Sequence, residues 1–103
     1  MWGFGLAFAM ALTFEWDAEK AKRNVTKHGV SFDEAATAFA DPLGQLVDDP
    51  RHSVAEKRLV LLGHSHRQRL LAIMFAERGD TIRVISARLA TRQEQRDYEE
   101  GSR

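Results

Sequence analysis

Residues 70–90, LLAIMFAERGDTIRVISARLA, contain two apolar runs separated by a polar tip. Residues 70–75 are apolar at every position and rich in branched and aromatic side chains, a pattern typical of a strand that is covered on both faces. Residues 77–80 (ERGD) are turn formers, and Gly79 can adopt a positive φ. Residues 81–88 alternate only in part between apolar and polar side chains. The stretch therefore predicts a β-hairpin at the centre of the fold.

The chain of 103 residues is 44% hydrophobic and 29% charged, which suits one compact domain with a single core. Its formal charge is zero, which on its own argues against a strong nucleic-acid binder. The charges are nevertheless uneven: residues 1–50 carry four basic and eight acidic side chains, whereas residues 51–103 carry eleven and seven. This asymmetry predicts a basic face opposite an acidic one. With no cysteine, the chain has neither disulfides nor a thiolate metal site, and we expect it in the reducing cytoplasm.

The first residues of the chain, MWGFGLAFAMAL, are apolar but fall short of the roughly 20 that a membrane helix needs. They lack the basic start of a signal peptide, and their two glycines would weaken a helix. Met10 is an alternative start that would leave residues 1–9 as an upstream extension. We therefore expect an apolar extension over residues 1–12, outside the fold and outside any membrane, followed by one domain over residues 13–103.

Two N-terminal helices are predicted from their capping residues. Residues 18–27 are good helix formers that lie between Asp17, a capping residue, and Gly29, a natural helix end. Ser31 is followed by a glutamate three residues later, which is the spacing of a capping box. It should open a second helix that ends at residues 41–42 (DP), because proline cannot continue a helix.

A last helix is expected over residues 92–100, because Thr91 and Glu94 repeat the capping-box spacing. Apolar runs bounded by turn residues predict the strands of one sheet. The fold class is therefore α+β: a small antiparallel sheet of four to five strands, with two N-terminal helices packed on it and a short C-terminal helix. The expected strands begin near residues 13, 43, 58, 69 and 81.

Four arginines start or end the expected strands: Arg58, Arg69, Arg83 and Arg88. Planar guanidinium groups bind phosphates bidentately, and cations around a phosphodiester stabilise the charge that builds as it is attacked. In RNA the neighbouring 2′-hydroxyl can be the nucleophile, so a site can work with a proton acceptor and a proton donor and without a metal. The side chains of suitable type to carry these protons are His28, Glu56 and Tyr98.

Arg83 and Arg88 have opposite parity, so a regular strand would send them to opposite faces of the sheet. A β-bulge or a strand end near Ala87 would be needed to bring both into one site. Arginines at strand ends more often face solvent, His28 suits a helix C-terminus, and Tyr98 could merely dock the last helix. The competing hypothesis is therefore a non-catalytic module whose basic sheet edge docks an acidic partner or nucleic acid.

A metal site is less favoured than a solvated turn. His64 and His66 are two residues apart and His52 is available, but the pair is flanked by arginines and has no carboxylate nearby in the sequence. The sequence also lacks a glycine-rich phosphate loop, a glycosidase-type carboxylate pair and a Gly-x-Ser-x-Gly nucleophile motif. We therefore expect no metal and no cofactor.

Two long runs and several single positions carry a family resemblance: Phe14-Glu15-Trp16-Asp17, Lys20, Asn24, residues 27–32 (KHGVSF), Glu34-Ala35, Phe39, Asp41, Gly63 and residues 82–88 (IRVISAR). They closely resemble the BrnT family, the toxin halves of bacterial type II toxin–antitoxin pairs. The resemblance covers about residues 13–100, nearly all of the expected domain. The spacing between the two runs makes it specific.

The resemblance implies a RelE-like ribonuclease fold and metal-independent RNA cleavage that inhibits translation. It also implies neutralisation by a BrnA-like antitoxin with a DNA-binding domain, contact with operator DNA only through that antitoxin, and room for a homodimer within the complex. The family's Glu-x-Arg pattern matches Glu56 and Arg58. On this hypothesis Arg83 and Arg88 hold the scissile phosphate, Arg58, Arg69 and Lys27 guide the RNA backbone, and His28, Glu56 or Tyr98 moves protons.

Overall fold

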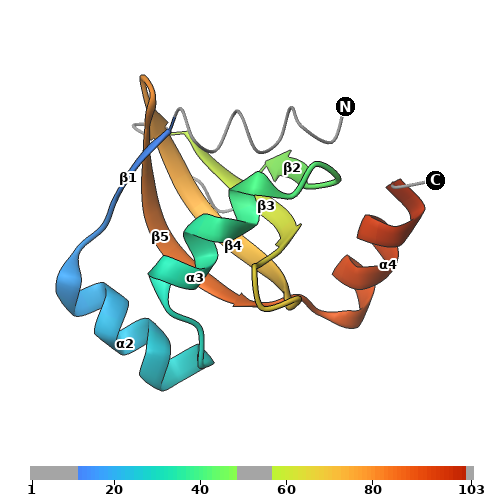
Figure 1. Ribbon diagram of the computed structural model, residues 1–103, viewed down its shortest axis with the longest axis horizontal. Helices are drawn as coiled ribbons and strands as arrows, with labels where there is room; N and C mark the ends of the chain where they lie inside the picture. Colours follow the sequence, from blue (N-terminus) through green and yellow to red (C-terminus); the bar gives the residue numbers. More distant parts are fainter. Residues whose placement is uncertain (1–11, 49–56, 102–103) are drawn as a thin grey trace.

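The computed structural model describes residues 12–48 and 57–101. Its elements are β1 (Thr13–Glu15), α2 (Ala18–His28), α3 (Phe32–Thr37), the short 3₁₀ helix η1 (Ala38–Ala40), β2 (Gln45–Asp48), β3 (Arg58–His64), β4 (Leu70–Arg78), β5 (Thr81–Leu89) and α4 (Arg92–Gly101). The predicted α+β class, with two N-terminal helices and a C-terminal helix, is confirmed (Figure 1). The predicted extension lies outside the described residues except for Leu12, which packs against the core.

The five strands form one sheet in the order β1-β5-β4-β3-β2. The strands from β2 to β5 pair antiparallel with their neighbours, as predicted. β1 instead pairs parallel with β5, which makes the sheet mixed at this edge. A parallel pair needs a long connection, and here the whole chain from α2 to β4 lies between the two strands.

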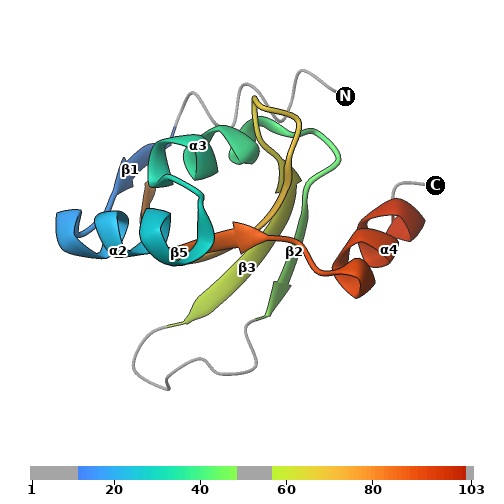
Figure 2. The same ribbon diagram turned by 90° about the horizontal axis from the view of Figure 1, so that it is seen from below.

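The helices pack on both faces of the sheet but cover them unequally. α2 and α3 lie over one face, whereas α4 packs at one end of the other (Figures 1 and 2). The main core lies under α2 and α3, where the Phe39 ring packs edge-to-face on Phe14 at 5.2 Å and on Phe75 at 5.0 Å between ring centroids. A smaller cluster lies beneath Tyr98 of α4. None of the described helices is long and apolar enough to span a membrane.

β4 and β5 form the predicted central hairpin, and they are longer than the two apolar runs. β4 continues through Arg78, so the turn contains only Gly79 and Asp80 instead of the four predicted turn residues. Gly79 has a φ of +63°, as predicted. Apolar side chains of β4 belong to both clusters, which confirms a strand with a partner on each face: Leu71, Ile73 and Phe75 in the main core, and Leu70, Ala72 and Met74 in the smaller cluster.

Both N-terminal helices begin as their capping residues predict, and α2 also ends as predicted, whereas α3 ends at Thr37 and continues as η1 up to Asp41. Asp17 Oδ1 accepts backbone N–H groups in the first turn of α2, and Gly29, with a φ of +70°, ends this helix. Ser31 Oγ accepts the backbone N–H of Glu34 at the start of α3. The Glu34 carboxylate does not complete the predicted capping box, because it bonds Arg69 instead.

Candidate functional site

A β-bulge at Ile85 decides which way the arginines of β5 point. Met74 of β4 pairs with Ser86, but the next residue, Phe75, pairs with Val84, so Ile85 has no partner on β4. The extra residue changes the parity of the strand. Arg83 and Arg88 therefore lie on the same face of the sheet, which fulfils the condition that the sequence set for a shared site.

This face is the one turned away from α2 and α3, and Arg58 of β3 also lies on it. Arg58 and Arg83 both pair with Ala76, one from each side, which separates their Cα atoms by roughly 10 Å at the usual strand spacing. Arg88 pairs with Ala72, roughly 13 Å farther along β4. We call the surface formed by Arg58, Arg83 and Arg88 the arginine face. Ala72, Met74 and Ala76 of β4 lie between these arginines on this face.

Two of the three arginines have carboxylate partners. Arg83 Nη1 lies 3.3 Å from Glu15 Oε2, across the β1–β5 pair. Arg88 forms a bidentate pair with Glu94 of α4, at 2.7 and 3.1 Å. Hydrogen bonding in this pair raises the pKa of Arg88 and, together with the Thr91 backbone N–H, lowers the pKa of Glu94 against the effect of burial. Both arginines are about one-third exposed, so a ligand can still reach them.

Arg58 differs from the other two because a donor atom of its guanidinium is unused. Its Nε is buried and has no hydrogen-bond partner among the described residues. A buried N–H donor without a partner is costly. Because solvent does not reach Nε, a backbone oxygen of a nucleic acid would bind Arg58 through its terminal guanidinium nitrogens.

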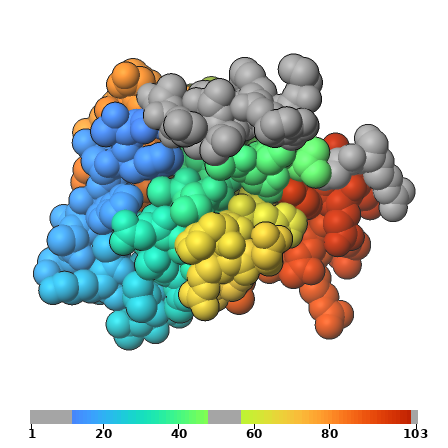
Figure 3. Space-filling model, viewed as in Figure 1, coloured from blue at the N-terminus to red at the C-terminus, as the bar shows by residue number. Residues whose placement is uncertain are grey.

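Arg69 lies on the other side of the sheet from the arginine face. Its guanidinium pairs with the buried Glu34 of α3, with Nε at 2.9 Å from Oε2, and Nη2 donates to the Gly29 carbonyl at 3.1 Å. The hydrogen bond from Arg69 lowers the pKa of Glu34 to about 2, although burial opposes the shift. The turn that contains Arg69 lies beside α3 on the molecular surface (Figure 3). Arg69 therefore neutralises a buried carboxylate and is not brought together with the other three arginines.

The remaining predicted residues are dispersed. Lys27 and His28 lie in the last turn of α2, on the helix-covered side of the sheet, with Lys27 exposed and His28 half-buried. Glu56, like His52, lies outside the described residues. Of the two predicted proton carriers that the structure describes, His28 and Tyr98, it is Tyr98 that lies on the same side of the sheet as the arginine face.

Tyr98 is buried and its hydroxyl is held by two neighbours. It donates to Asp41 Oδ2 at 2.7 Å, and His64 Nδ1 lies 3.1 Å from the hydroxyl oxygen. Burial and the adjacent carboxylate raise the pKa of Tyr98. Burial also raises the pKa of Asp41, but hydrogen bonds from the His64 and Leu43 backbones and from Tyr98 outweigh it and leave that pKa lowered. The cluster joins η1, β3 and α4.

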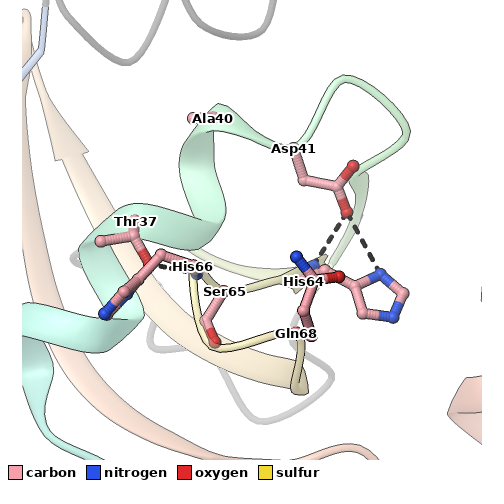
Figure 4. Close-up of a pocket in the computed structure, with 7 residues that line it drawn as sticks. All are labelled: Thr37, Ala40, Asp41, His64, Ser65, His66 and Gln68. Carbon is pink, nitrogen blue, oxygen red and sulfur yellow. Dashed lines mark hydrogen bonds and ion pairs between the residues drawn. The ribbon is translucent and has the colours of Figure 1, made fainter.

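Asp41 and His64 also line an open hollow beside η1 (Figure 4). His66, at its other end, bonds through its ring Nδ1 and its backbone N–H to Thr37 Oγ1, at 3.2 and 3.0 Å. The two histidines therefore have different protein partners. Among the described residues, no three histidine or carboxylate side chains are placed to bind one metal ion.

Glu15 is a residue of this site that the sequence did not reveal. Its neighbours Phe14 and Trp16 pack against the core, so alternation alone places Glu15 on the opposite face. Its partner was not predictable, because the parallel register that sets Glu15 beside Arg83 joins residues 68 positions apart. The sequence likewise showed that a bulge was needed to place Arg83 and Arg88 on one face, but it did not show that the bulge exists.

Comparisons with known proteins confirm the family resemblance. The family model described as "Ribonuclease toxin, BrnT, of type II toxin-antitoxin system" matches residues 16–94. The crystal structure of the ribonuclease toxin BrnT of Brucella abortus is similar in fold, with a TM-score of 0.60 and 24% sequence identity over 79% of this chain and 99% of that one. No curated protein matches the chain. The chain therefore belongs to the BrnT family of ribonuclease toxins of type II toxin–antitoxin systems, which act on RNA and are paired with an antitoxin.

Proposed function

We propose that this chain cleaves RNA on the arginine face without a metal ion, by attack of a 2′-hydroxyl on the adjacent phosphodiester. One observation carries the proposal: the bulge at Ile85 turns Arg83 and Arg88 to the face that also bears Arg58. Three guanidinium groups on one face suit a phosphate chain, because each can donate two hydrogen bonds to it. Their charges can stabilise the negative charge that grows on the phosphate during attack.

The roles within the site follow from position. Arg83 and Arg88 hold the scissile phosphate, and Arg58, on the same face, binds the neighbouring backbone. The Tyr98 hydroxyl already donates to Asp41 and its pKa is raised, so we assign Tyr98 no proton transfer at the scissile phosphate. Lys27, His28 and Arg69 lie on the other side of the sheet, and we assign them no contact with the scissile phosphate.

In the cell, the unbound protein would inhibit translation by cutting RNA. Its antitoxin would be a BrnA-like protein that carries a DNA-binding domain, so that the complex contacts operator DNA through the antitoxin alone. The complex would have room for a homodimer of the toxin. These finer statements rest on the resemblance of the sequence to the family, and the basic arginine face supports the RNA part of them.

The experiment that tests the proposal is cleavage of RNA by the purified protein in EDTA. We expect cleavage by the wild type and loss of roughly 100-fold or more in rate for Arg83→Ala and for Arg88→Ala, because each removes one phosphate-stabilising cation. Arg92→Ala is the matched control, since Arg92 is an exposed arginine of α4 outside the arginine face. RNA with a 2′-deoxy nucleotide at the cleavage site should resist cutting.

Two results would contradict the proposal. Wild-type protein that binds RNA and never cuts it would indicate the non-catalytic binding module instead. Unchanged cleavage by Arg83→Ala and Arg88→Ala, at equal thermal stability, would place the chemistry elsewhere in the chain. In cells, Arg88→Ala should relieve growth arrest at equal abundance, whereas Arg92→Ala should not.

A further inference from the structure

Glu15 places an accessible carboxylate at one end of the arginine face. The register of β1 against β5 sets Glu15 directly beside Arg83, and the two side chains lie on the same side of the sheet. Glu15 Oε2 is 3.3 Å from Arg83 Nη1 and 3.7 Å from Arg78 Nη1. The Glu15 side chain is 42% exposed, so substrate can reach it. Among the described residues, these two arginines are the charged groups in contact with it, and their contacts leave Oε1 available.

The other described titratable groups on this face are less suited to accept a proton. Both oxygens of Glu94 are bound by Arg88, and Oε1 also accepts the Thr91 backbone N–H at 2.9 Å. The Tyr98 hydroxyl already donates to Asp41. His64 pairs with Leu70, six residues along β4 from the partner of Arg83, which is a distance of roughly 20 Å.

We propose that Glu15 is the group that accepts the proton of the attacking 2′-hydroxyl, an inference that rests on the proposed function. The charges fit this role: Glu15, Arg78 and Arg83 sum to one positive charge, which matches one phosphodiester. A phosphate bound by Arg83 brings the 2′-hydroxyl of the same linkage to the carboxylate that touches Arg83. Glu15 is then a catalytic residue, and Arg83 binds both the base and the phosphate.

The reaction balances as a transesterification. The 2′-hydroxyl gives its proton to Glu15 Oε1, and the 2′-oxygen forms a bond to phosphorus with its electron pair. The bond from phosphorus to the 5′-oxygen breaks, and that oxygen leaves with the pair and takes a proton from water. The products are a 2′,3′-cyclic phosphate and a 5′-hydroxyl, and Glu15 returns its proton to solvent.

The test is the pH dependence of single-turnover cleavage for Glu15→Gln, which keeps the size of the side chain and an oxygen for Arg83. We expect the rate to fall by at least about 100-fold with RNA affinity nearly unchanged. We also expect the acidic limb of the wild-type pH–rate profile to disappear. Glu15→Asp should keep that limb at a reduced rate. Glu77→Gln is the control, because Glu77 is an exposed carboxylate of β4.

The outcomes separate this inference from the proposed function. Absence of cleavage by the wild type would overturn the proposed function and this inference with it. A wild type that cleaves, together with a Glu15→Gln variant that cleaves equally fast, would overturn the inference alone. So would a slower Glu15→Gln variant that keeps the acidic limb or loses RNA affinity in proportion, since Glu15 would then only position Arg83. Thermal unfolding of each variant verifies the fold.

Discussion

Glu34 is a buried carboxylate, and its charge is neutralised by Arg69, which lies 35 residues later in the sequence. Its side chain is 3% exposed and is bonded by Arg69, by Ser65 Oγ at 2.7 Å and, more loosely, by Arg67 at 3.7 Å. A buried charge is tolerated only when it is paired and hydrogen-bonded, so this cluster ties α3 to the turn between β3 and β4. Arg69 therefore has a structural role that its position at a strand start did not disclose.

The ion pair between Glu34 and Arg69 should stabilise the fold at neutral pH and lose this effect in acid. The pKa of Glu34 is lowered from 4.5 to about 2 in the folded protein, so its contribution is complete above pH 4.5 and is lost as the pH falls toward 2. We expect Arg69→Met to lower stability most above pH 4.5, with the difference from wild type shrinking toward pH 2. Urea unfolding between pH 2 and 7 measures this. The control is Arg67→Ala, which should change the free energy of unfolding little because the Arg67 side chain is 62% exposed. An effect of Arg69→Met that does not depend on pH would contradict the ion pair as its cause.

At the scale of elements, Asn24 of α2 completes the edge of β5. β1 pairs with β5 only from Thr81 to Arg83, so the later part of β5 has no neighbouring strand on that side. There the buried Asn24 side chain takes the place of a strand: Nδ2 donates to the Ala87 carbonyl at 2.7 Å, and Oδ1 accepts the Ala87 backbone N–H at 3.2 Å. Nδ2 also donates to the Val30 carbonyl at 2.8 Å. Asn24 thus fixes the strand next to Arg88.

Removing this side chain should destabilise the protein and loosen the site together. Asn24→Ala leaves two carbonyls and one N–H without partners in a buried place, and we expect a cost of about 3 kcal/mol in the free energy of unfolding. Urea denaturation measures it, and amide hydrogen exchange at Ala87 should speed up. Val25→Ala, at the next and 49% exposed position, is the control. A loss below that of Val25→Ala would show that water replaces the Asn24 contacts.

Two side chains of α4, one helical turn apart, attach it to the rest of the fold, and Gln45 of β2 also donates to the Tyr98 carbonyl at 2.8 Å. Glu94 binds Arg88, and Tyr98 reaches Asp41 and His64. We expect Tyr98→Phe to cost about 1 kcal/mol of stability, because the hydroxyl is lost while the ring still packs. Hydrogen exchange should increase in α4 and not in β4. An equal increase in the two elements, or no increase in α4, would mean that the Tyr98 hydroxyl does not hold the helix in place.

The sequence predicted those elements whose signals are local. Asp17, Ser31 and Thr91 each begin a helix as predicted, because a capping side chain bonds backbone groups only two or three residues away. The bulge could not be predicted, since Ile85 is as apolar as Val84 and either residue could have faced the core. The same limit applies to Glu15 and Arg83, which meet through a register between strands distant in sequence.

At the scale of the whole molecule, a formal charge of zero hides a surface that is divided by the sheet. The helix-covered side uses Arg69 internally, whereas the opposite side presents Arg58, Arg83 and Arg88, whose carboxylate contacts among the described residues come from Glu15 and Glu94. Net charge therefore does not argue against RNA binding here, because a polyanion responds to the local field. Binding should then depend on displacement of counterions from RNA by these arginines.

The salt dependence of RNA affinity tests this division of charge. For single strands the logarithm of the association constant falls by about 0.7 per phosphate contact for each logarithmic unit of salt, so three arginines predict a slope of about −2. We expect Arg58→Ala to make the slope shallower by about 0.7, measured with a non-cleavable 2′-deoxy substrate. Lys22→Ala removes an exposed cation of α2 on the other side of the sheet and should leave the slope unchanged. If both variants reduced the slope equally, RNA would contact both sides of the molecule, and the arginine face would not be the binding surface by itself.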